Sequence, residues 1–269
     1  MMNNPAHNLL DEALGLNDDA VSGSSCGGGS GSVLLIEDSV ETSGAFILHH
    51  LMKRSLSPQR PSDVIIFLSF AHPFSHYDRI LRKMGCNLVM KRDNKRFLYH
   101  DLLMLKYPGP DGDQEKAIES MLLGLYGKLQ KTVELCSLPE TNKNITIMID
   151  DVSLMEVAAN GSSNRVLDFL HYCYSLTTEY GCSVVILDHE DIYSSTDRPS
   201  PLLQMEYLAN VVIRAEPLAT GLASDVHGQL TVFNKGVRHG FGGLKGKIHN
   251  FHFKIKENNV EYFYPGSRT

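Results

Sequence analysis

The sequence has no tryptophan, no pair of cysteines at C-x-x-C spacing and no long apolar run. A membrane-spanning helix needs about 18 consecutive apolar residues, and no run approaches that length. The N-terminus also lacks the basic and apolar pattern of a signal peptide. The five cysteines are odd in number, which is typical of reduced thiols in the cytosol or nucleus. We therefore expect a cytoplasmic and nuclear protein with no membrane contact, no metal site and no cofactor.

Positive charge is also scarce, because 25 lysines and arginines stand against 31 aspartates and glutamates, giving a net charge of −6. This balance argues against attraction of the whole surface to nucleic acid, but it leaves local patches open. One such patch runs from Arg79 to Arg96, with seven basic residues and a single acid, Asp93. It is either a solvated helix face and loop or a surface that faces RNA or a protein partner.

A phosphate-binding lysine is missing where the chain layout calls for one. A buried strand over 33–36, an eight-residue loop over 37–44 and a helix that starts at Ala45 have the arrangement of a P-loop, whose formula is G-x-x-x-x-G-K-[ST]. Every fixed position of the formula is lost: Glu37 and Thr42 replace the glycines, Ser43 replaces the lysine, and Gly44 replaces the hydroxyl residue. The sequence predicts a degenerate P-loop that lacks the Walker A motif.

Three carboxylates occupy this loop instead: Glu37, Asp38 and Glu41. P-loop glycines let backbone N–H groups surround phosphate oxygens, and the lysine neutralises phosphate charge. Each lost charge-assisted hydrogen bond costs roughly 1.5–3 kcal/mol, and repulsion between like charges adds to that cost. Taken alone, the segment fits either a nucleotide-hydrolase scaffold without its phosphate site or an ordinary strand, turn and helix of another α/β fold.

The segment 144–151, NITIMIDD, predicts a second landmark of nucleotide hydrolases. A β-prone apolar strand leads into paired aspartates, as in a Walker B strand, whose terminal carboxylate reaches Mg²⁺ in active enzymes. Asp150 is the matching residue. Without a lysine on the first loop, we favour a structural role, in which Asp150 and Asp151 cap the following helix or bind the neighbouring loop.

Strands alternate with helices through the first 190 residues, which predicts a parallel sheet with right-handed crossovers, completed by antiparallel C-terminal strands. We expect strands at 33–36, 64–70, 102–105, 144–151, 182–187, 211–215, 230–233, 251–255 and 260–264, and helices around 76–84, 116–135, 164–180 and 201–210. This order is typical of a RecA-like three-layer α/β/α core. Residues 1–30 are predicted to be a flexible segment with a possible short amphipathic helix at 8–16, and 31–269 a single domain.

Two polar loops are candidates for contacts. The loop 234–250 carries several cations and an aromatic ring but no acid; its candidate nucleic-acid contacts are Lys235, Arg238, Phe241, Lys245 and Lys247. Cations neutralise phosphates and a ring stacks on a base, yet a flexible solvated hairpin tip explains the loop equally well. The segment 188–191, DHED, has no G-x-S-x-G nucleophile to serve, so it is a polar loop or a nucleic-acid or intersubunit loop rather than a hydrolase site.

Four segments together resemble the family of the sixth subunit of the Elongator complex, over most of residues 5–265. They are the loop after VLLIED, the strand ITIMIDDVS, the strand CSVVILDHED and the segment LLQMEYLANVVIRAEPLATG. The resemblance implies a RecA-like fold without Walker motifs and a hetero-hexameric ring with the fourth and fifth subunits. It also implies that the ring binds tRNA, docks on the catalytic Elongator core and supports a carboxymethyl-type modification at C5 of the wobble uridine.

The resemblance carries over no catalytic residue, and it places loops that face the central hole of the ring at roughly 156–165 and 189–201. Two other functions stay open at this point. One is a divergent ATPase that a neighbouring subunit completes in trans. The other is a RecA-paralogue mediator that binds single-stranded DNA.

Overall fold

In the computed structural model, the described residues are 8–16, 31–105, 114–138, 143–193, 201–219, 221, 223, 225–235 and 246–266. They form one sheet of nine strands in the order β3-β2-β4-β5-β1-β6-β7-β8-β9. The strands are β1 (Val33–Asp38), β2 (Asp63–Ser69), β3 (Phe97–Asp101), β4 (Asn144–Ile149), β5 (Ser183–His189), β6 (Val211–Glu216), β7 (Gly228–Asn234), β8 (Lys247–Ile255) and β9 (Val260–Phe263). In this order, each pair of neighbours among the first six strands, from β3 at the edge to β6, is parallel. The pairs β6–β7, β7–β8 and β8–β9 are antiparallel.

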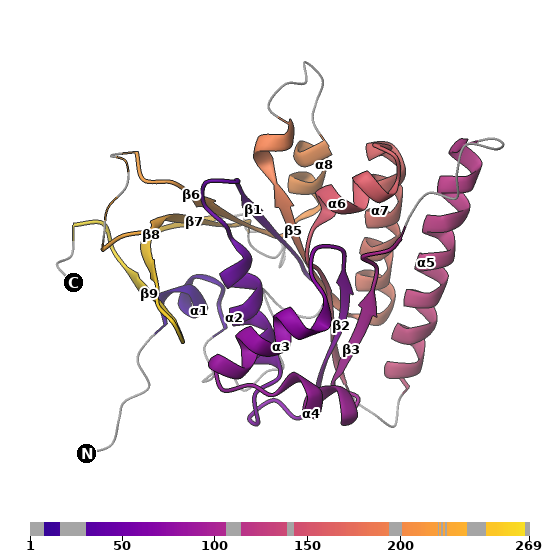
Figure 1. Ribbon diagram of the computed structural model, residues 1–269, viewed down its shortest axis with the longest axis horizontal. Helices are drawn as coiled ribbons and strands as arrows, with labels where there is room; N and C mark the ends of the chain where they lie inside the picture. The colour runs from indigo at the N-terminus through magenta and orange to yellow at the C-terminus, as the bar shows by residue number, and fades with distance from the viewer. Residues whose placement is uncertain are drawn as a thin grey trace, which may run out of the picture.

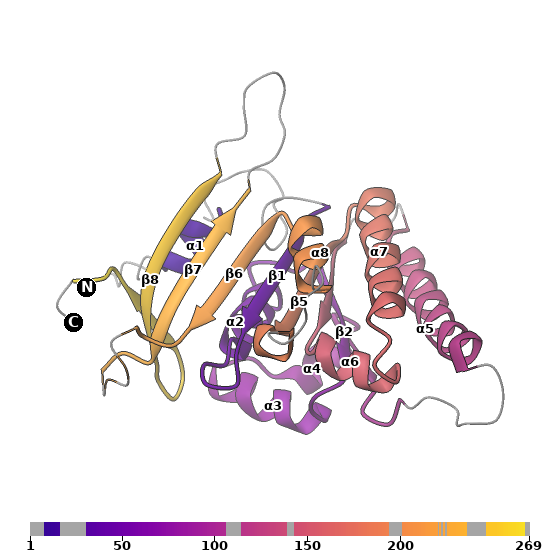
Figure 2. The same cartoon turned by 90° about the horizontal axis from the view of Figure 1, so that it is seen from above.

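Helices cover both faces of the sheet, so the architecture has three layers (Figures 1 and 2). The helices are α1 (Leu9–Ala13), α2 (Ala45–Ser55), α3 (Phe74–Lys83), α4 (Leu88–Asp93), α5 (Gln114–Cys136), α6 (Val152–Ala158), α7 (Ser163–Tyr180) and α8 (Pro201–Leu208), with a short 3₁₀ helix η1 (Glu190–Tyr193). Helices α5 to α8 pack on one face and α1 to α4 on the other, each over its own apolar core. The predicted mostly parallel sheet with antiparallel C-terminal strands is confirmed.

Strand β1 lies at the centre of the sheet, between β5 and β6. All six of its residues are buried, which explains why its apolar run is continuous rather than alternating. The chain passes from β1 to β2 on one side and from β5 to β6 on the other, so the strand order reverses at β1. In open parallel sheets, ligands bind beyond the carboxyl ends of the strands at such a point.

The N-terminal helix α1 packs on α2. The Asn8 side chain accepts a hydrogen bond from the Leu10 N–H at 3.0 Å and thereby caps the helix. Asp11 pairs with His50 at 2.8 Å and with Arg54 at 3.1 Å. A short helix thus lies within the predicted 8–16, whereas the predicted linker at 17–30 is outside the described residues.

The third strand differs from its prediction. We expected it at Leu102–Leu105, but β3 is Phe97–Asp101, and residues 102–105 form a turn. β3 is a short edge strand in which only Phe97 is fully buried, so its sequence FLYHD has neither a continuous apolar run nor a clear alternation, and the signal was weak. The expected loop at 156–165 is also mostly helical, since only residues 159–162 lie between α6 and α7.

Candidate functional site

Charged side chains gather where four neighbouring strands end, at the carboxyl edge of β4, β5, β1 and β6. The parallel register places Glu37 beside Asp188 on one side and beside Arg214 on the other. Asp38 lies beside His189 in the same register. This edge is the position at which a RecA-like enzyme would bind nucleotide phosphates, and here it is dominated by acids.

The first loop uses its backbone donors on the protein itself. The Gly44 N–H donates to the Asp38 carboxylate at 2.6 Å, and the Val40 N–H donates to Asp191 at 3.1 Å. The Thr42 N–H donates to the Ser39 carbonyl at 3.1 Å, closing a tight turn. A phosphate cradle needs several such N–H groups pointing at one anion. In this loop, three of them already have oxygen acceptors within the chain.

Gly44 is required by the close packing of this loop on β1. A Cβ atom at this position would lie 2.9 Å from the Ile36 Cγ2 and 3.2 Å from the Asp38 Cβ. Contacts below 3.0 Å force a neighbour to move, and Ile36 is fully buried. The glycine that occupies the hydroxyl position of the P-loop formula therefore lets the Asp38 carboxylate reach the loop backbone.

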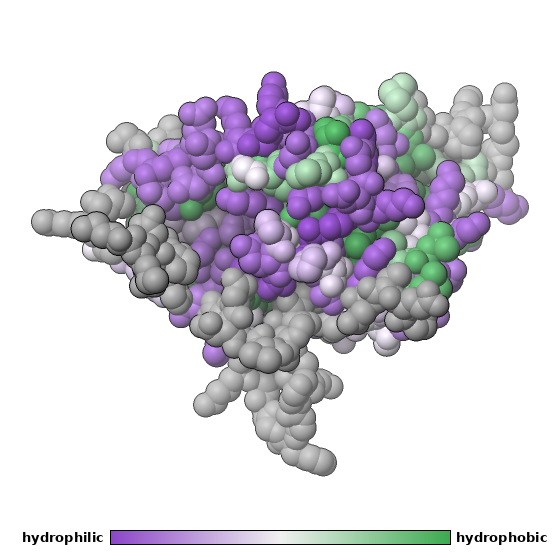
Figure 3. Space-filling model, turned by 90° about the horizontal axis from the view of Figure 1, so that it is seen from below, coloured by the Kyte–Doolittle hydropathy of each residue, from purple (hydrophilic) through white to green (hydrophobic). Residues whose placement is uncertain are grey.

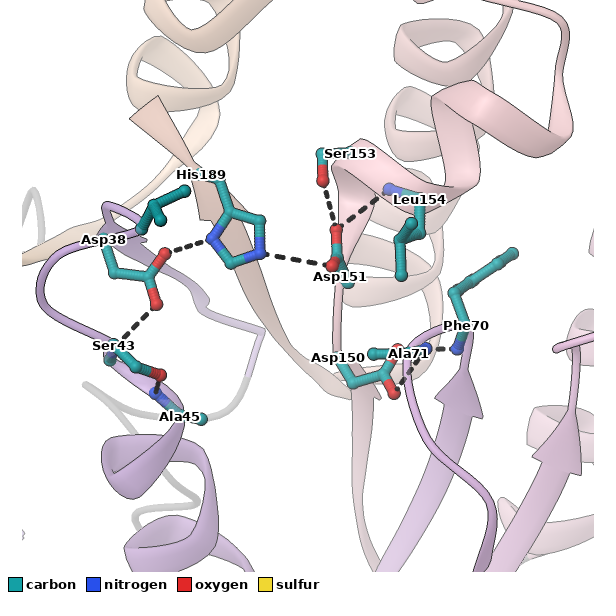
Figure 4. A network of polar contacts seen from close by, with 12 residues as sticks. Asp38, Ser43, Ala45, Phe70, Ala71, Asp150, Asp151, Ser153, Leu154 and His189 are labelled. Carbon is teal, nitrogen blue, oxygen red and sulfur yellow. Dashed lines mark hydrogen bonds and ion pairs between the residues drawn. The ribbon is translucent and has the colours of Figure 1, made fainter. Parts of the chain in front are cut away.

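His189 bridges two buried aspartates across this edge (Figure 4). Its Nδ1 contacts Asp38, and its Nε2 lies 3.2 Å from an oxygen of Asp151. The hydrogen bonds with Asp151 and Asp38 raise the pKa of His189 to about 10, so the ring is a cation at neutral pH and donates to both carboxylates. In P-loop NTPases the corresponding segments hold Mg²⁺ between them. Here an internal imidazolium supplies positive charge at that place.

The two aspartates after β4 have separate structural roles. Asp151 caps α6 by accepting from the Leu154 N–H at 2.9 Å. Burial would raise the pKa of Asp151, but the hydrogen bonds from His189 and Ser153 lower it below its ordinary value.

Asp150 points away from His189 and toward the turn after β2 (Figure 4). It accepts hydrogen bonds from the Ser69 hydroxyl at 2.8 Å, the Tyr77 hydroxyl at 2.5 Å, and the N–H groups of Phe70 and Ala71 at 2.7 and 3.1 Å. Burial raises the pKa of Asp150 despite these donors. The carboxylate predicted to match Walker B therefore holds the turn between β2 and α3, in keeping with the structural role favoured from the sequence.

Glu37 forms a second buried ion pair, with Arg214 on β6. The Arg214 Nε lies 2.5 Å from the Glu37 carboxylate, and a second guanidinium nitrogen lies 2.6 Å from Glu206 on α8. Burial raises the pKa of Glu37 to about 7 even though Arg214 opposes the shift. On the neighbouring strand, burial together with Glu156 and Asp151 raises the pKa of Asp188 to about 8. Both shifts show that burial and neighbouring carboxylates disfavour negative charge at this edge, so it does not suit phosphate groups.

The predicted basic loop is only partly described. Arg238, Phe241 and Lys245 lie outside the described residues. Lys235 follows β7 directly, and its ammonium group donates to the backbone carbonyl of Glu206. Lys247 is exposed at the first position of β8, which begins four residues earlier than expected. The candidate contacts in this loop therefore stay predictions.

His189 and the pair His72–His76 were missed as site residues in the sequence. His189 was assigned to a polar loop, although its position directly after a buried strand was a signal that it lies at the sheet edge. His72 and His76 are four residues apart, and their rings stack with centroids 4.0 Å apart. Among the described residues, no group of three or more His, Cys, Asp or Glu side chains is arranged to hold a metal ion, and no helix is long and apolar enough to cross a membrane.

The strand order and the degenerate first loop define the class: a RecA-like chain without the residues that bind phosphate. A solved structure supports the fold, since a KaiC-like protein from Pyrococcus horikoshii superposes with a TM-score of 0.65 over 95% of each chain, at 10% identity. The family model described as Elongation complex protein 6 matches residues 10–257. The chain therefore belongs to the Elongation complex protein 6 family.

Curated relatives agree with this assignment. The chain is 28% identical to Elongator complex protein 6 of Xenopus laevis over 96% of both chains. It is 25% identical to the human protein of the same name, over 88% of this chain and 91% of the relative. The family resemblance inferred from the sequence and the RecA-like fold are thus confirmed.

Proposed function

We propose that this chain is a non-catalytic subunit of the Elongator complex. In this proposal it forms a hetero-hexameric RecA-like ring with the fourth and fifth subunits, and the ring docks on the catalytic core. The ring binds tRNA and supports the carboxymethyl-type modification at C5 of the wobble uridine, in the cytoplasm and nucleus. Family membership and the names of the relatives support membership of the complex, while the partners and the reaction are expected from the resemblance.

The observation that supports a non-catalytic role best is the closed first loop. The N–H groups of Gly44, Val40 and Thr42 have acceptors within the chain, and one of these acceptors is the Asp38 carboxylate. To bind a triphosphate, the loop would have to break these bonds and place phosphate charge beside Asp38 and Glu37. No lysine of the loop compensates for that cost.

Exposed apolar side chains on both flanks of the edge support assembly with other subunits. Val40, Ile192, Leu203 and Tyr207 lie on one flank, each at least half exposed. On the other flank, a cavity of about 330 Å³ is lined by apolar side chains: Phe70, Leu102, Leu103, Leu105, Leu154, Val157 and Ala158. Large exposed apolar patches mark protein interaction sites. A ring subunit needs two such contact surfaces, one for each neighbour.

Nucleotide binding by the purified chain tests the non-catalytic role. Calorimetric titration with Mg²⁺–ATP should give no measurable heat of binding for the wild type, because the loop donors are already used. Micromolar affinity of the wild type would contradict the proposal and favour the ATPase alternative. Hydrolysis by the reconstituted ring, with and without a swap of residues 37–44, then shows whether a neighbour completes a site in trans.

Competition on the assembled complex tests the choice of nucleic acid. Labelled tRNA should be displaced by unlabelled tRNA and much less by single-stranded DNA of equal length. The opposite ranking would favour a recombination mediator.

A further inference from the structure

A positively charged surface lies on α3 and α4. Of the seven cations between residues 79 and 96, three have structural partners. Arg96 donates to backbone carbonyls of Asp63, Ser57, Ser55 and Arg60. Two others pair with carboxylates, Arg82 with Asp78 at 2.7 Å and Lys83 with Glu257 at 3.1 Å.

Four cations of this segment form no ion pair with any described carboxylate: Arg79, Lys91, Arg92 and Lys95. All but the half-buried Lys91 are exposed. The end of the molecule where α4 lies is mainly hydrophilic when seen from below (Figure 3). In a chain of net charge −6, unpaired cations on one face make a local site for an anion.

Aromatic and histidine side chains lie beside these cations. The Arg92 guanidinium lies over the Phe74 ring, 4.5 Å from its centroid, and Phe74 meets Tyr99 edge to face at 5.4 Å. The stacked His72 and His76 rings continue this surface, because the Tyr99 hydroxyl donates to the His72 carbonyl at 2.8 Å. Burial and the nearby His72 and Arg79 lower the pKa of His76. In sites for single-stranded nucleic acid, aromatic rings stack on bases while neighbouring cations bind phosphates.

Asp150, directly after β4, holds the turn that carries His72 in place. Asp150 accepts hydrogen bonds from the N–H groups of Phe70 and Ala71, and the single Ser69 hydroxyl proton lies between the Asp150 carboxylate at 2.8 Å and the His72 carbonyl at 2.6 Å. Tyr77, one residue beyond His76, donates to the same carboxylate. A buried carboxylate thus fixes the turn and the first turns of α3, so the rings are ordered before any ligand binds.

Lys95 lies in the turn after α4, where it adopts φ +56°, the left-handed region in which glycine is preferred. Its side chain is exposed on the same surface.

We infer that α3, α4 and the turn before α3 bind a single-stranded RNA segment, with Arg79, Lys91, Arg92 and Lys95 on phosphates and the rings of His72, His76 and Phe74 on bases. This inference rests on the proposed tRNA binding and adds an RNA surface on a different part of the chain from the loop 234–250. An acidic protein segment would use the cations but not the rings.

The test compares two double charge reversals in the full chain. Arg79→Glu with Arg92→Glu changes the proposed surface, and Lys128→Glu with Lys131→Glu makes the same charge change on α5, which covers the opposite face of the sheet. Binding of a labelled oligouridine is measured by anisotropy at several salt concentrations, with urea unfolding as a check that both variants fold. Unlabelled polyglutamate and inorganic polyphosphate serve as competitors. The same variants are assembled with the fourth and fifth subunits and titrated with tRNA.

The first variant should bind oligouridine at least tenfold more weakly, and its log–log salt slope should fall by about 1.4, the value for two lost phosphate contacts on a single strand. The α5 variant should bind as the wild type does. An equal loss of oligouridine affinity in both variants, or no loss in either, overturns the proposed RNA surface. If polyglutamate or polyphosphate competes as effectively as unlabelled oligouridine, the proposal is also overturned, since the rings then play no part.

The assembled complex separates this inference from the proposed function. If the assembled wild type binds tRNA and the assembled Arg79→Glu, Arg92→Glu variant binds it equally well, this surface fails and the proposed function stands. If oligouridine binding follows the prediction but the assembly binds no tRNA, the proposed function fails.

Discussion

At the scale of the single residue, His189 decides the electrostatics of the acidic edge. It lies between Asp38 and Asp151, both almost fully buried, and supplies them with one positive charge. Removal of one partner from a buried ion pair leaves a charge without compensation, which costs several kcal/mol. The imidazolium is therefore a requirement of the fold rather than a surface feature.

We predict that His189→Gln loses on the order of 3 kcal/mol of unfolding free energy at pH 6. A histidine pKa raised from 6.5 to about 10 by folding stabilises the protein fully below pH 6.5. This contribution is lost as the pH rises toward 10, because only the folded state still holds the proton. The difference between wild type and variant, measured by urea unfolding from pH 6 to pH 10, should therefore shrink with pH. A difference that stays constant over this range would mean that the ring acts through packing and not through charge.

Gly44 offers a second test at this scale. Gly44→Ala should destabilise the chain by about 1–3 kcal/mol, because the new methyl group meets the buried Ile36 side chain. Gly124 on α5 is the matched control, since a Cβ there meets nothing within 4 Å. Gly124→Ala should stabilise the helix by about 0.5–1 kcal/mol. Thermal unfolding of the two variants measures both effects, and a loss in both would point to a cause other than the contact at Ile36.

At the scale of the element, Arg214 ties β6 and α8 to the end of β1. Its guanidinium contacts Glu37 on β1 and Glu206 on α8. β6 and α8 are neighbours in the chain, but β1 is distant from both, and the pair of Arg214 with Glu37 fixes the point at which the strand order reverses.

Arg214→Met should destabilise the chain by about 3 kcal/mol, because Glu37 remains buried without a counter-charge. Adding Glu37→Met should recover most of the loss, since apolar replacements of a buried ion pair are often neutral or stabilising. A double-mutant cycle in urea gives the coupling between the two side chains. Additive losses would show that Glu37 does not depend on Arg214.

Elements buried on both faces could be predicted from the sequence, and elements shaped by polar contacts could not. The strands β1 and β4 were found because continuous apolar runs mark central parallel strands. The prediction for β3 was displaced, because FLYHD is a short edge strand with one fully buried residue, while the apolar Leu102, Leu103 and Leu105 line a surface cavity instead. Asp150 and the loop acids were found by their positions relative to the strands. The contacts of His189 could not be found in this way, because its partners Asp38 and Asp151 are far from it in the sequence and no local pattern encodes them.

At the scale of the whole molecule, the exposed apolar side chains beside the acidic edge are those that an assembly would cover. Met104 is 78% exposed and Val157 is 72% exposed, next to the apolar cavity between the turn after β3 and α6. Because both side chains face solvent in the isolated chain, they contribute little to its own stability, and their substitution separates assembly from folding.

We predict that Met104→Glu with Val157→Glu leaves the urea midpoint of the isolated chain unchanged but abolishes copurification with the fourth and fifth subunits. Each glutamate would be buried in an apolar contact between subunits without a charge to pair with it. Burial of an unpaired charge weakens the binding free energy by several kcal/mol. Leu135→Glu is the control, since this side chain is 60% exposed near the far end of α5. Coexpression and size-exclusion chromatography measure the assembly. If the double variant assembles as well as the control, this flank is not a subunit interface, and the contact surface has to lie elsewhere, with the flank of Val40 and Tyr207 as the next to test.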